Sequence, residues 1–278
     1  MASSLLVAPS VVQAQTQAAS QAASVPGVEA EWLTARPRPD LNFAPDRRPS
    51  REQTMAAVEY VASSQIADMA AQPIALSTGS NLTQMSSNWV AATYYIGAAR
   101  LARVSDDPET LRFLTAIGEH YNYSLRGARS GPTMLNADDM TIGDLYLELY
   151  SRRGQDGVLM PLRQRLDYAV PHLNRANETD ALIWWWADAL YMAPPVFARM
   201  SAITGDQKYI NAMDKEFRRT IDRLWVPDQR LFLRDQRFAG RTEANGQPIY
   251  WSRANGWVMG GLARTLEAMP ADFEGRQD

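Results

Sequence analysis

The sequence of 278 residues contains no cysteine and only two histidines, His120 and His172. The absence of cysteine excludes disulfide bridges, thiolate metal sites and a cysteine nucleophile. With so few histidines, a histidine-rich metal site or a histidine relay is not expected, and no metal-ligand spacing occurs along the chain. The side chains that remain for chemistry are carboxylates, arginines and aromatic rings.

The chain also lacks a strong charge bias and a long apolar run. Its formal net charge is -3, and both signs are scattered, so there is no basic footprint for nucleic acid and no polybasic membrane face. No apolar stretch approaches the roughly 20 residues that span a bilayer. We therefore expect no nucleic-acid partner and no membrane insertion, while the oligomeric state stays open. The hydrophobic content of 46% is enough for a sizeable core.

The first fifty residues differ in composition from the rest. Residues 1–26 are rich in alanine, serine and glutamine, and an apolar run at 4–8 resembles a secretory signal without its basic start. We interpret this leader as a damaged export signal of a periplasmic or secreted protein; a disordered leader on a cytoplasmic protein is the alternative. Residues 27–50 contain four prolines and are predicted to form an extended arm.

From residue 51 to 278 the pattern is helical, because apolar residues recur at steps of three and four. Turn residues between these runs give helix pairs with a spacing of roughly 50 residues, which is typical of a solenoid or a closed helical toroid. Strand content is low, so we predict an all-α fold, with a short extended piece at 231–233 and a hairpin-like loop at 240–248. The predicted helices cover residues 51–71, 88–104, 108–121, 136–150, 159–170, 196–203, 209–224 and 257–269.

The most unusual segment of the chain contains three consecutive tryptophans, Trp184, Trp185 and Trp186, followed by Asp188. Consecutive residues point in different directions, so the three indoles cannot all enter one core, and some are predicted to line a cavity. Beside such an apolar wall, desolvation raises the pKa of Asp188, which suits a general acid. The alternative is that Asp188 caps the following helix and that the tryptophans are core.

Two other helix starts carry polar candidates. Asp138 and Asp139 open a predicted helix, where N-capping and a favourable interaction with the helix dipole are the ordinary explanation. Asn88 and Trp89 open another, and can be simply a cap and a core residue. Each pair is also a candidate to contribute to a substrate-binding or catalytic site.

The segment 251–257 places Arg253 between Trp251 and Trp257. An arginine offers a bidentate clamp for a carboxylate, and indole faces stack on sugar rings. The alternative is a cation–π packing motif in a loop. If this segment meets two acids in one cavity, the combination suits a carbohydrate that bears a carboxylate, and two carboxyls are also typical of ordinary glycoside hydrolysis.

Four segments together resemble glycoside hydrolase family 105, the unsaturated rhamnogalacturonyl hydrolases, which are related to the family 88 unsaturated glucuronyl hydrolases. The resemblance covers the chain from about residue 51 and implies an (α/α)6 barrel with its site at the inner-helix end. The predicted helices are fewer than six hairpins require, so we expect a barrel truncated at its C-terminus, with apolar helix faces exposed. The four segments are residues 184–196, 204–209, 231–235 and 251–264.

The resemblance implies an unusual reaction, in which the enzyme hydrates the C4=C5 double bond of a terminal unsaturated uronyl residue, and the glycosidic bond then breaks. It implies that Asp188 is the general acid/base, that Asp138 or Asp139 is the second acid, and that no cofactor is needed. Arg234 falls where some relatives have histidine. The candidate substrate contacts are Asn88, Trp89, Asp139, Trp186, Arg234, Trp251, Arg253 and Trp257.

The expected function is therefore hydrolysis of 4,5-unsaturated galacturonyl residues on rhamnogalacturonan oligosaccharides. One alternative is an unsaturated glucuronyl hydrolase that acts on other lyase products. The other alternative belongs to a different class of protein, a non-catalytic helical carbohydrate-binding protein.

Overall fold

The computed structural model describes residues 29–42, 46–71, 85–105, 107–127 and 131–277. The predicted leader at 1–26 lies outside the described residues. The chain divides into two compact units. The first contains the described residues up to Ser86 together with Tyr94–His120, and the second contains Ser87–Thr93 and the chain from Tyr121 onward. Helix α3 (Trp89–Leu101) contributes residues to both.

The first unit contains the 3-10 helix η1 (Ala30–Leu33), α2 (Arg51–Ala70) and α4 (Pro108–His120). A capping box starts α2, since the Ser50 side chain accepts from the Gln53 amide and the Gln53 side chain accepts from the Ser50 amide. The predicted arm is not wholly extended, because η1 buries Trp32 edge-on against Phe113 at a centroid distance of 5.4 Å. The arm is thereby anchored to α4.

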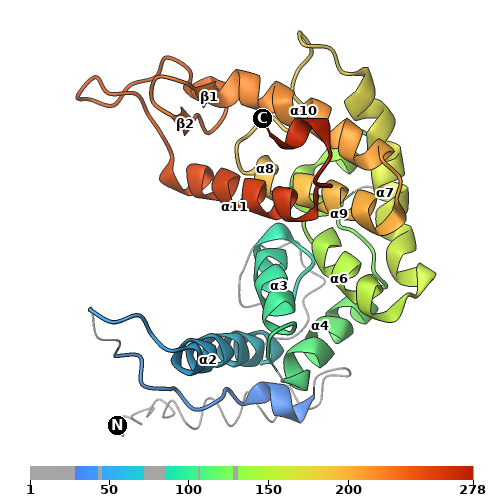
Figure 1. The fold of residues 1–278 in the computed structure, drawn as a ribbon, viewed down its shortest axis with the longest axis vertical. Coiled ribbons are helices and arrows are strands. Elements are labelled where there is room, and N and C mark those ends of the chain that lie inside the picture. The colour runs from blue at the N-terminus through green and yellow to red at the C-terminus, as the bar shows by residue number, and fades with distance from the viewer. Residues whose placement is uncertain (1–28, 43–45, 72–84, 106, 128–130, 278) are drawn as a thin grey trace, which may run out of the picture. The chain divides into compact units, whose positions relative to one another are not determined.

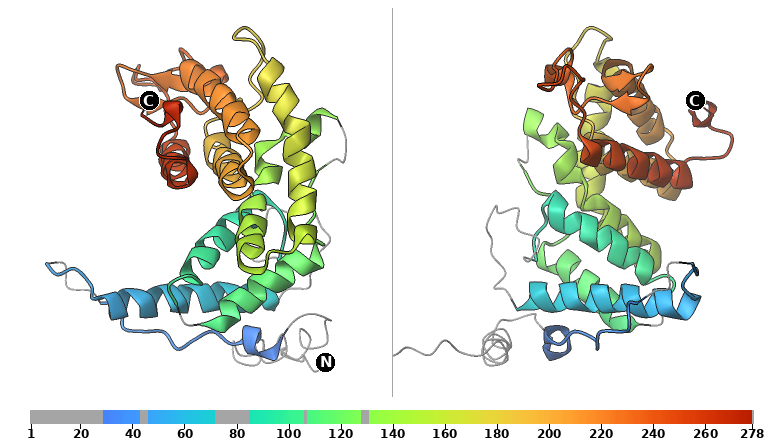
Figure 2. Two further views of the ribbon diagram at one scale, coloured as in Figure 1. Left: turned by 45° about the vertical axis from the view of Figure 1, so that its right-hand side comes forward. Right: turned by 90° about the vertical axis from the view of Figure 1, so that its left-hand side faces the viewer.

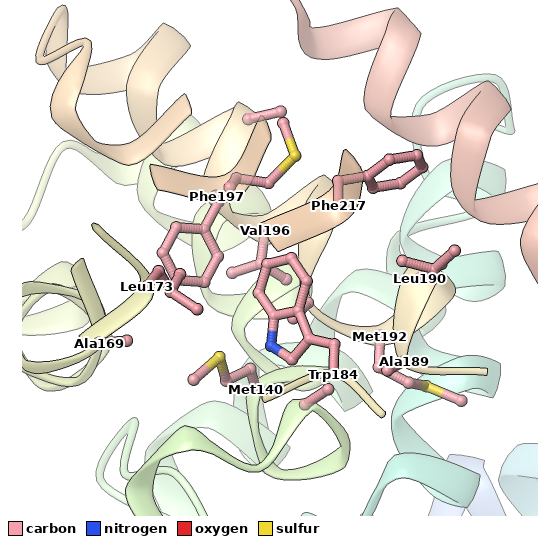
Figure 3. Close-up of a cluster of buried hydrophobic side chains, with 14 of the residues drawn as sticks. Met140, Ala169, Leu173, Trp184, Ala189, Leu190, Met192, Val196, Phe197 and Phe217 are labelled. Carbon is pink, nitrogen blue, oxygen red and sulfur yellow. The ribbon is translucent and has the colours of Figure 1, made fainter. Parts of the chain in front are cut away.

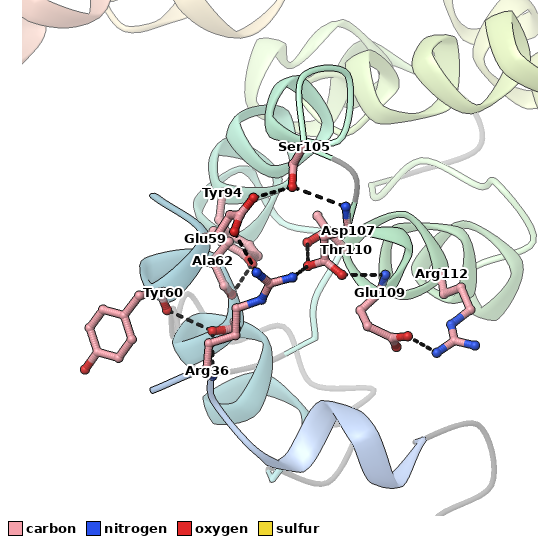
Figure 4. A network of polar contacts seen from close by, with 11 residues as sticks. Arg36, Glu59, Tyr60, Ala62, Tyr94, Ser105, Asp107, Glu109, Thr110 and Arg112 are labelled. Atoms are coloured by element: carbon pink, nitrogen blue, oxygen red, sulfur yellow. Dashed lines mark hydrogen bonds and ion pairs between the residues drawn. The ribbon is translucent and has the colours of Figure 1, made fainter. Parts of the chain in front are cut away.

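Arg36 fastens the same arm to two helices (Figure 4). Its guanidinium lies 2.6 Å from a Glu59 carboxylate oxygen of α2 and 3.1 Å from Asp107. Asp107 also accepts a hydrogen bond from the Glu109 amide at 3.0 Å, as expected for the residue before a helix that begins with Pro108.

The second unit is almost entirely helical, which confirms the predicted all-α class. A two-stranded antiparallel sheet, β1 (Trp225–Val226) and β2 (Leu231–Phe232), confirms the short extended piece. The helices of the second unit are α5 (Ala137–Met140), α6 (Gly143–Arg153), α7 (Asp156–Arg175), α8 (Ala189–Met192), α9 (Pro194–Thr204), α10 (Lys208–Leu224) and α11 (Ser252–Ala268). Three short 3-10 helices accompany them: η2 (Pro132–Leu135), η3 (Gln236–Phe238) and η4 (Glu274–Arg276). No helix of the described ranges is both long enough and apolar enough to cross a bilayer.

The helices of this unit pack in neighbouring pairs (Figures 1 and 2). Helix α10 packs on α7 and α9, and α11 packs on α8 and α9. Trp184 lies within the core that these helices form, fully buried and edge-on to Phe197 at 5.7 Å (Figure 3). Burial of a large apolar side chain of this kind stabilises the fold by roughly 1.5–3 kcal/mol.

A buried ion network joins α6, α9 and α11. Asp144 of α6 accepts hydrogen bonds from Arg199 of α9 and Arg264 of α11. Glu148, one turn later, pairs with Arg199 at 3.1 Å and with Arg152 at 2.9 Å. Both carboxylates are buried, and each has arginine partners, which is the condition under which buried charge is tolerated.

Two glycines allow α11 to cross close to α8. A Cβ on Gly261 would clash with the backbone carbonyl of Leu190, and one on Gly260 would lie 3.3 Å from the Tyr191 ring. The Gly-Gly pair is therefore a packing requirement of this helix crossing.

The single helix predicted over 136–150 is wrong. It is interrupted at Thr141 and Ile142, where the amides of Thr141 and Asp144 donate to carbonyls three residues earlier, at 3.3 and 3.2 Å. Such bonds form a tighter turn than the α-helix. Asp138 and Asp139 therefore lie on a separate one-turn helix, α5.

Two other predicted boundaries are also wrong. Helix α7 begins at Asp156 and continues past Pro171 to Arg175, and Leu173 in this extension packs into the core. Helix α11 begins at Ser252 and not at 257, so Arg253 lies in its first turn and not in a loop. Asn255 fixes that turn, since its side chain bonds to both the amide and the carbonyl of Phe232.

Candidate active site

The three tryptophans do not all enter one core, as predicted. Trp184 is fully buried, Trp186 is half-buried and Trp185 is 44% exposed. The rings of Trp185 and Trp186 lie 4.9 Å apart. One indole therefore anchors the segment in the core, while the other two form an accessible aromatic surface.

Helix α10 positions this segment through a buried carboxylate. Glu216 accepts hydrogen bonds from the backbone amides of Ile183 at 2.6 Å and Trp184 at 3.1 Å, and it also pairs with Arg219. Thr220 donates to the Trp184 carbonyl at 3.0 Å. Sequence reasoning missed Glu216; the available signal was a glutamate on the buried face of a strongly amphipathic helix.

Asp188 occupies the N-cap position of α8, as that alternative expected, but its side chain does not serve as a cap. Its backbone is helical, with φ -61° and ψ -26°, and its side chain makes no cap hydrogen bond. Its Oδ1 is buried and has no hydrogen-bond partner among the described residues. Burial raises the pKa of Asp188 to about 6, against the opposing effect of Arg253 and Arg234.

Asp138 lies within electrostatic range of Asp188. Burial raises the pKa of Asp138 to about 6, and the charges of Asp139 and Asp188 add to the shift. The N-cap of α5 is Asn136, whose side chain accepts from the Asp138 amide at 2.8 Å, so the capping alternative does not account for the Asp138 side chain. The half-buried carboxyl at the start of α8 therefore acts on the half-buried carboxyl of α5.

Asp139 points elsewhere. Its carboxylate lies against Gly127, where any Cβ would collide with it, and burial raises its pKa while Arg165 lowers it. The charge of Asp188 contributes to the raised pKa of Asp138, whereas the charges that act on the Asp139 pKa are those of Arg165 and Arg126. Of the two adjacent acids, Asp138 is thus the one oriented toward Asp188.

Arg253 and Trp251 form the cation–π pair that the sequence offered as an alternative. The Arg253 guanidinium lies 3.9 Å from the Trp251 ring centroid. The side chain is exposed at the start of α11, and its charge acts on Asp188. The stacking therefore holds a cation beside the proposed acid, and the two interpretations are compatible.

Trp257 extends the aromatic surface one turn further along α11. Its ring lies 4.5 Å from Tyr191 and 6.3 Å from Trp89, the latter edge-on. The Asn88 side chain accepts from the Ala91 amide at 2.9 Å, which confirms its interpretation as a helix cap. Trp89 is partly buried and reaches the candidate site through Trp257.

Arg234 is brought to the site by a backbone connection. Its carbonyl accepts from the Ala187 amide at 2.8 Å, and its guanidinium lies 5.5 Å from the Trp251 ring. It also pairs with Asp235 at 3.0 Å, a buried residue that sequence reasoning missed. No group of three potential metal ligands occurs among the described residues.

This arrangement can donate a proton near neutral pH and bind an anionic sugar. Asp138 and Asp188 hold protons in a range where free aspartates have lost them. The charges of Arg253 and Arg234 act on Asp188, and the partly exposed indoles of Trp186, Trp251 and Trp257 supply an aromatic surface. A carboxyl kept protonated by its environment is the usual general acid.

Comparison with curated proteins finds relatives of similar sequence. The chain is 33% identical over 198 residues to an unsaturated 3S-rhamnoglycuronyl hydrolase of an Alteromonas species, with 66% of this chain and 47% of that protein covered. It is 32% identical to one from Formosa agariphila, covering 68% and 53%. An unsaturated rhamnogalacturonyl hydrolase of Bacillus subtilis is 23% identical, covering 64% and 53%. The chain spans about half the length of the curated relatives it matches.

Solved structures share the fold. A family 88 glycosyl hydrolase from Bacteroides vulgatus superposes with a TM-score of 0.63 at 21% identity, and a family 105 glycoside hydrolase from C. acetobutylicum with 0.54 at 20%. Each match covers 69% of this chain and 57% of the other. These likenesses confirm the helical toroid fold. Residues 61–278 match the sequence profile of Glycosyl Hydrolase Family 88, and the chain therefore belongs to that family.

Proposed function

We propose that this chain carries the site of an unsaturated uronyl hydrolase, with Asp188 as general acid/base and Asp138 as the second carboxyl. The observation that carries the proposal is Asp188 itself: its pKa is raised to about 6 by burial, its charge raises the pKa of Asp138, and one of its buried oxygens has no partner within the described ranges. Such a group is poised to give a proton to a bound substrate and not to a structural partner.

In the proposed reaction, protonated Asp188 donates to C4 of the unsaturated sugar. Water adds its oxygen at C5 and returns a proton to Asp188, so the net change is addition of one water. The resulting hemiketal opens and the glycosidic bond breaks without attack by the protein. Arg253, stacked on Trp251, would pair with the uronate, while Asp138 stays neutral and hydrogen-bonds the sugar or the water.

The substrate we propose is an unsaturated uronyl residue joined to rhamnose. Rhamnogalacturonan fragments with an unsaturated galacturonyl end are the first candidate. Unsaturated glucuronyl–rhamnose fragments are the second, and the 32–33% identical relatives named rhamnoglycuronyl hydrolases favour them.

The test follows the ultraviolet absorbance of the C4=C5 bond in both disaccharides. Loss of absorbance with release of rhamnose is the expected result. The C4=C5 bond removes the C4 stereocentre that separates galacturonate from glucuronate, so the faster substrate identifies the preferred linkage to rhamnose. If neither is consumed although the folded protein binds them, the non-catalytic carbohydrate-binding alternative holds and the proposed chemistry is wrong.

A further inference from the structure

The segment after β2 carries a second cationic group that the proposed reaction does not use. This segment is fastened to the tryptophans through its backbone, because Trp186 and Asp235 form an antiparallel bridge. The next residues form the short helix η3, which contains Arg237. Arg237 is therefore held beside the aromatic surface by the main chain.

A single buried carboxylate organises two arginines in this segment. Asp235, 1% exposed, accepts from Arg234 Nη1 at 3.0 Å, from Arg237 Nε at 2.8 Å and from Arg237 Nη2 at 3.0 Å. Arg237 holds the pKa of Asp235 below its usual value, so this carboxylate is ionised. One negative charge faces two positive charges, which is one cation more than neutralisation of Asp235 requires.

Each guanidinium also lies over an aromatic ring. Arg234 is over Trp251, and its charge acts on Asp188. Arg237 is 5.0 Å from the centroid of the Trp185 ring, the exposed indole of the triplet. The two arginines thus extend from the proposed acid toward the accessible end of the aromatic surface.

Arg237 retains hydrogen-bonding capacity for a ligand. Its side chain is 60% exposed. A guanidinium has five N–H donors, and the edge formed by Nε and Nη2 faces Asp235. The end of the guanidinium formed by Nη1 and the second Nη2 hydrogen has no hydrogen-bond partner among the described residues, and this edge can pair bidentately with carboxylate or sulfate.

We propose that Arg237 and Trp185 form an anion-binding subsite for a negatively charged substituent on the sugar to which the unsaturated uronyl residue is bonded. The substituent is a sulfate ester or a carboxylate, and Trp185 stacks on the ring that carries it. Asp235 is a positioning residue that orients Arg237. This inference rests on the proposed function, because that function defines which sugar is cleaved and which is released.

The test separates binding from turnover. Saturated disaccharides, which cannot be hydrated, are compared in three forms: with a neutral second sugar, with its sulfate ester, and with a uronate in its place. Binding is followed by tryptophan fluorescence, and turnover is measured on the unsaturated counterparts by absorbance. The variants are Arg237→Gln, Arg237→Lys and, as a control of equal charge change, Arg230→Gln in the exposed β1–β2 turn.

We expect the unaltered protein to bind one anionic form at least tenfold more tightly than the neutral form, and the preferred form identifies sulfate or carboxylate. Arg237→Gln should remove about tenfold of affinity for that form, raise KM without lowering kcat, and change the neutral form less than twofold. Arg237→Lys should restore part of the preference, and Arg230→Gln should leave it intact.

Equal loss on all three forms in Arg237→Gln, or no anionic preference in the unaltered protein, would overturn the subsite. Selective binding without turnover of any unsaturated form would instead overturn the proposed function and leave the subsite standing.

Discussion

Two sets of carboxyls in the second unit have opposite surroundings: one set is buried and paired with arginines, and the other is half-buried and lacks such partners in the described parts of the chain. Asp144 and Glu148 on α6 are paired with the arginines of α6, α9 and α11. Asp138, six residues before Asp144, and Asp188 repel each other, and one Asp188 oxygen has no protein partner among the described residues. Burial alone therefore does not identify a catalytic acid. What distinguishes the proposed acid is a half-buried carboxyl with one buried oxygen that has no hydrogen-bonded partner among the described residues.

The largest expected effect comes from the unpaired set. Asp188→Asn should lower turnover by about 10³-fold, since a positioned acid contributes roughly 10²–10⁴-fold, while substrate affinity and circular dichroism stay unchanged. Initial rates by ultraviolet absorbance and binding by fluorescence measure the two. A variant that keeps more than a tenth of the rate would remove Asp188 from this role.

The paired set should respond in stability. Asp144→Ala leaves Arg199 and Arg264 without their shared carboxylate, and breaking a buried pair costs about 3–5 kcal/mol. Urea unfolding at neutral pH measures the change in the free energy of unfolding. A loss below about 1 kcal/mol would show that the ion network does not stabilise the fold, and would contradict the contrast between paired and unpaired carboxyls.

Activity should also depend on pH in the direction that the acid requires. The pKa of Asp188 and that of Asp138 are both raised to about 6, so the protonated form is lost as pH rises above that value. With the Asp188 proton as the single requirement, we expect kcat/KM to fall by about tenfold per pH unit above pH 6, or roughly 100-fold by pH 8; a steeper fall would show that the Asp138 proton is required as well. A rate that rises over this range would indicate a required carboxylate instead.

The helix crossing that supports the ion network gives a matched pair of glycine variants. Gly261→Ala forces α11 away from the Leu190 carbonyl and should cost about 1–3 kcal/mol in unfolding free energy. Gly256→Ala, on the same helix with open space around its Cβ, should be neutral or stabilising by up to about 1 kcal/mol. Equal effects in thermal unfolding would contradict the close approach.

The smallest expected effect is a gain in stability from removal of an unpaired acid. The folded pKa of Asp138 is about 6 and its ordinary value is 3.8, so its stabilising contribution is present below pH 4 and lost as pH rises through 6. Asp138→Asn should therefore raise the unfolding free energy at pH 8 by on the order of 1 kcal/mol, after allowance for partial exposure. Urea unfolding at pH 4 should show no such gain.

The sequence predicted most helices, because apolar spacing is a local signal, and the two tryptophan motifs supplied the residues of the candidate site. It placed Arg253 in a loop, since Asn255-Gly256 is ordinarily a turn signal; here Asn255 is held by bonds to Phe232, which local propensity does not include. Nor could spacing decide between Asp138 and Asp139, because that depends on the interruption at Thr141 and on what Gly127 and Arg165 place beside Asp139. Glu216 and Asp235 went unnoticed because their partners are distant backbone amides and arginines.

Helix α11 carries residues of both the candidate site and the buried ion network. Arg253 and Trp257 occupy its first turns, Gly261 meets α8, and Arg264 enters the ion network three residues later. Successive residues of a helix are rotated by about 100° around its axis. One insertion or deletion between Arg253 and Gly261 would therefore rotate the sugar-facing end away while the packed end stayed fixed. Length variation should be confined to the hairpin-like loop at 240–248, and the interval from 253 to 264 should keep its exact residue count in any functional homologue.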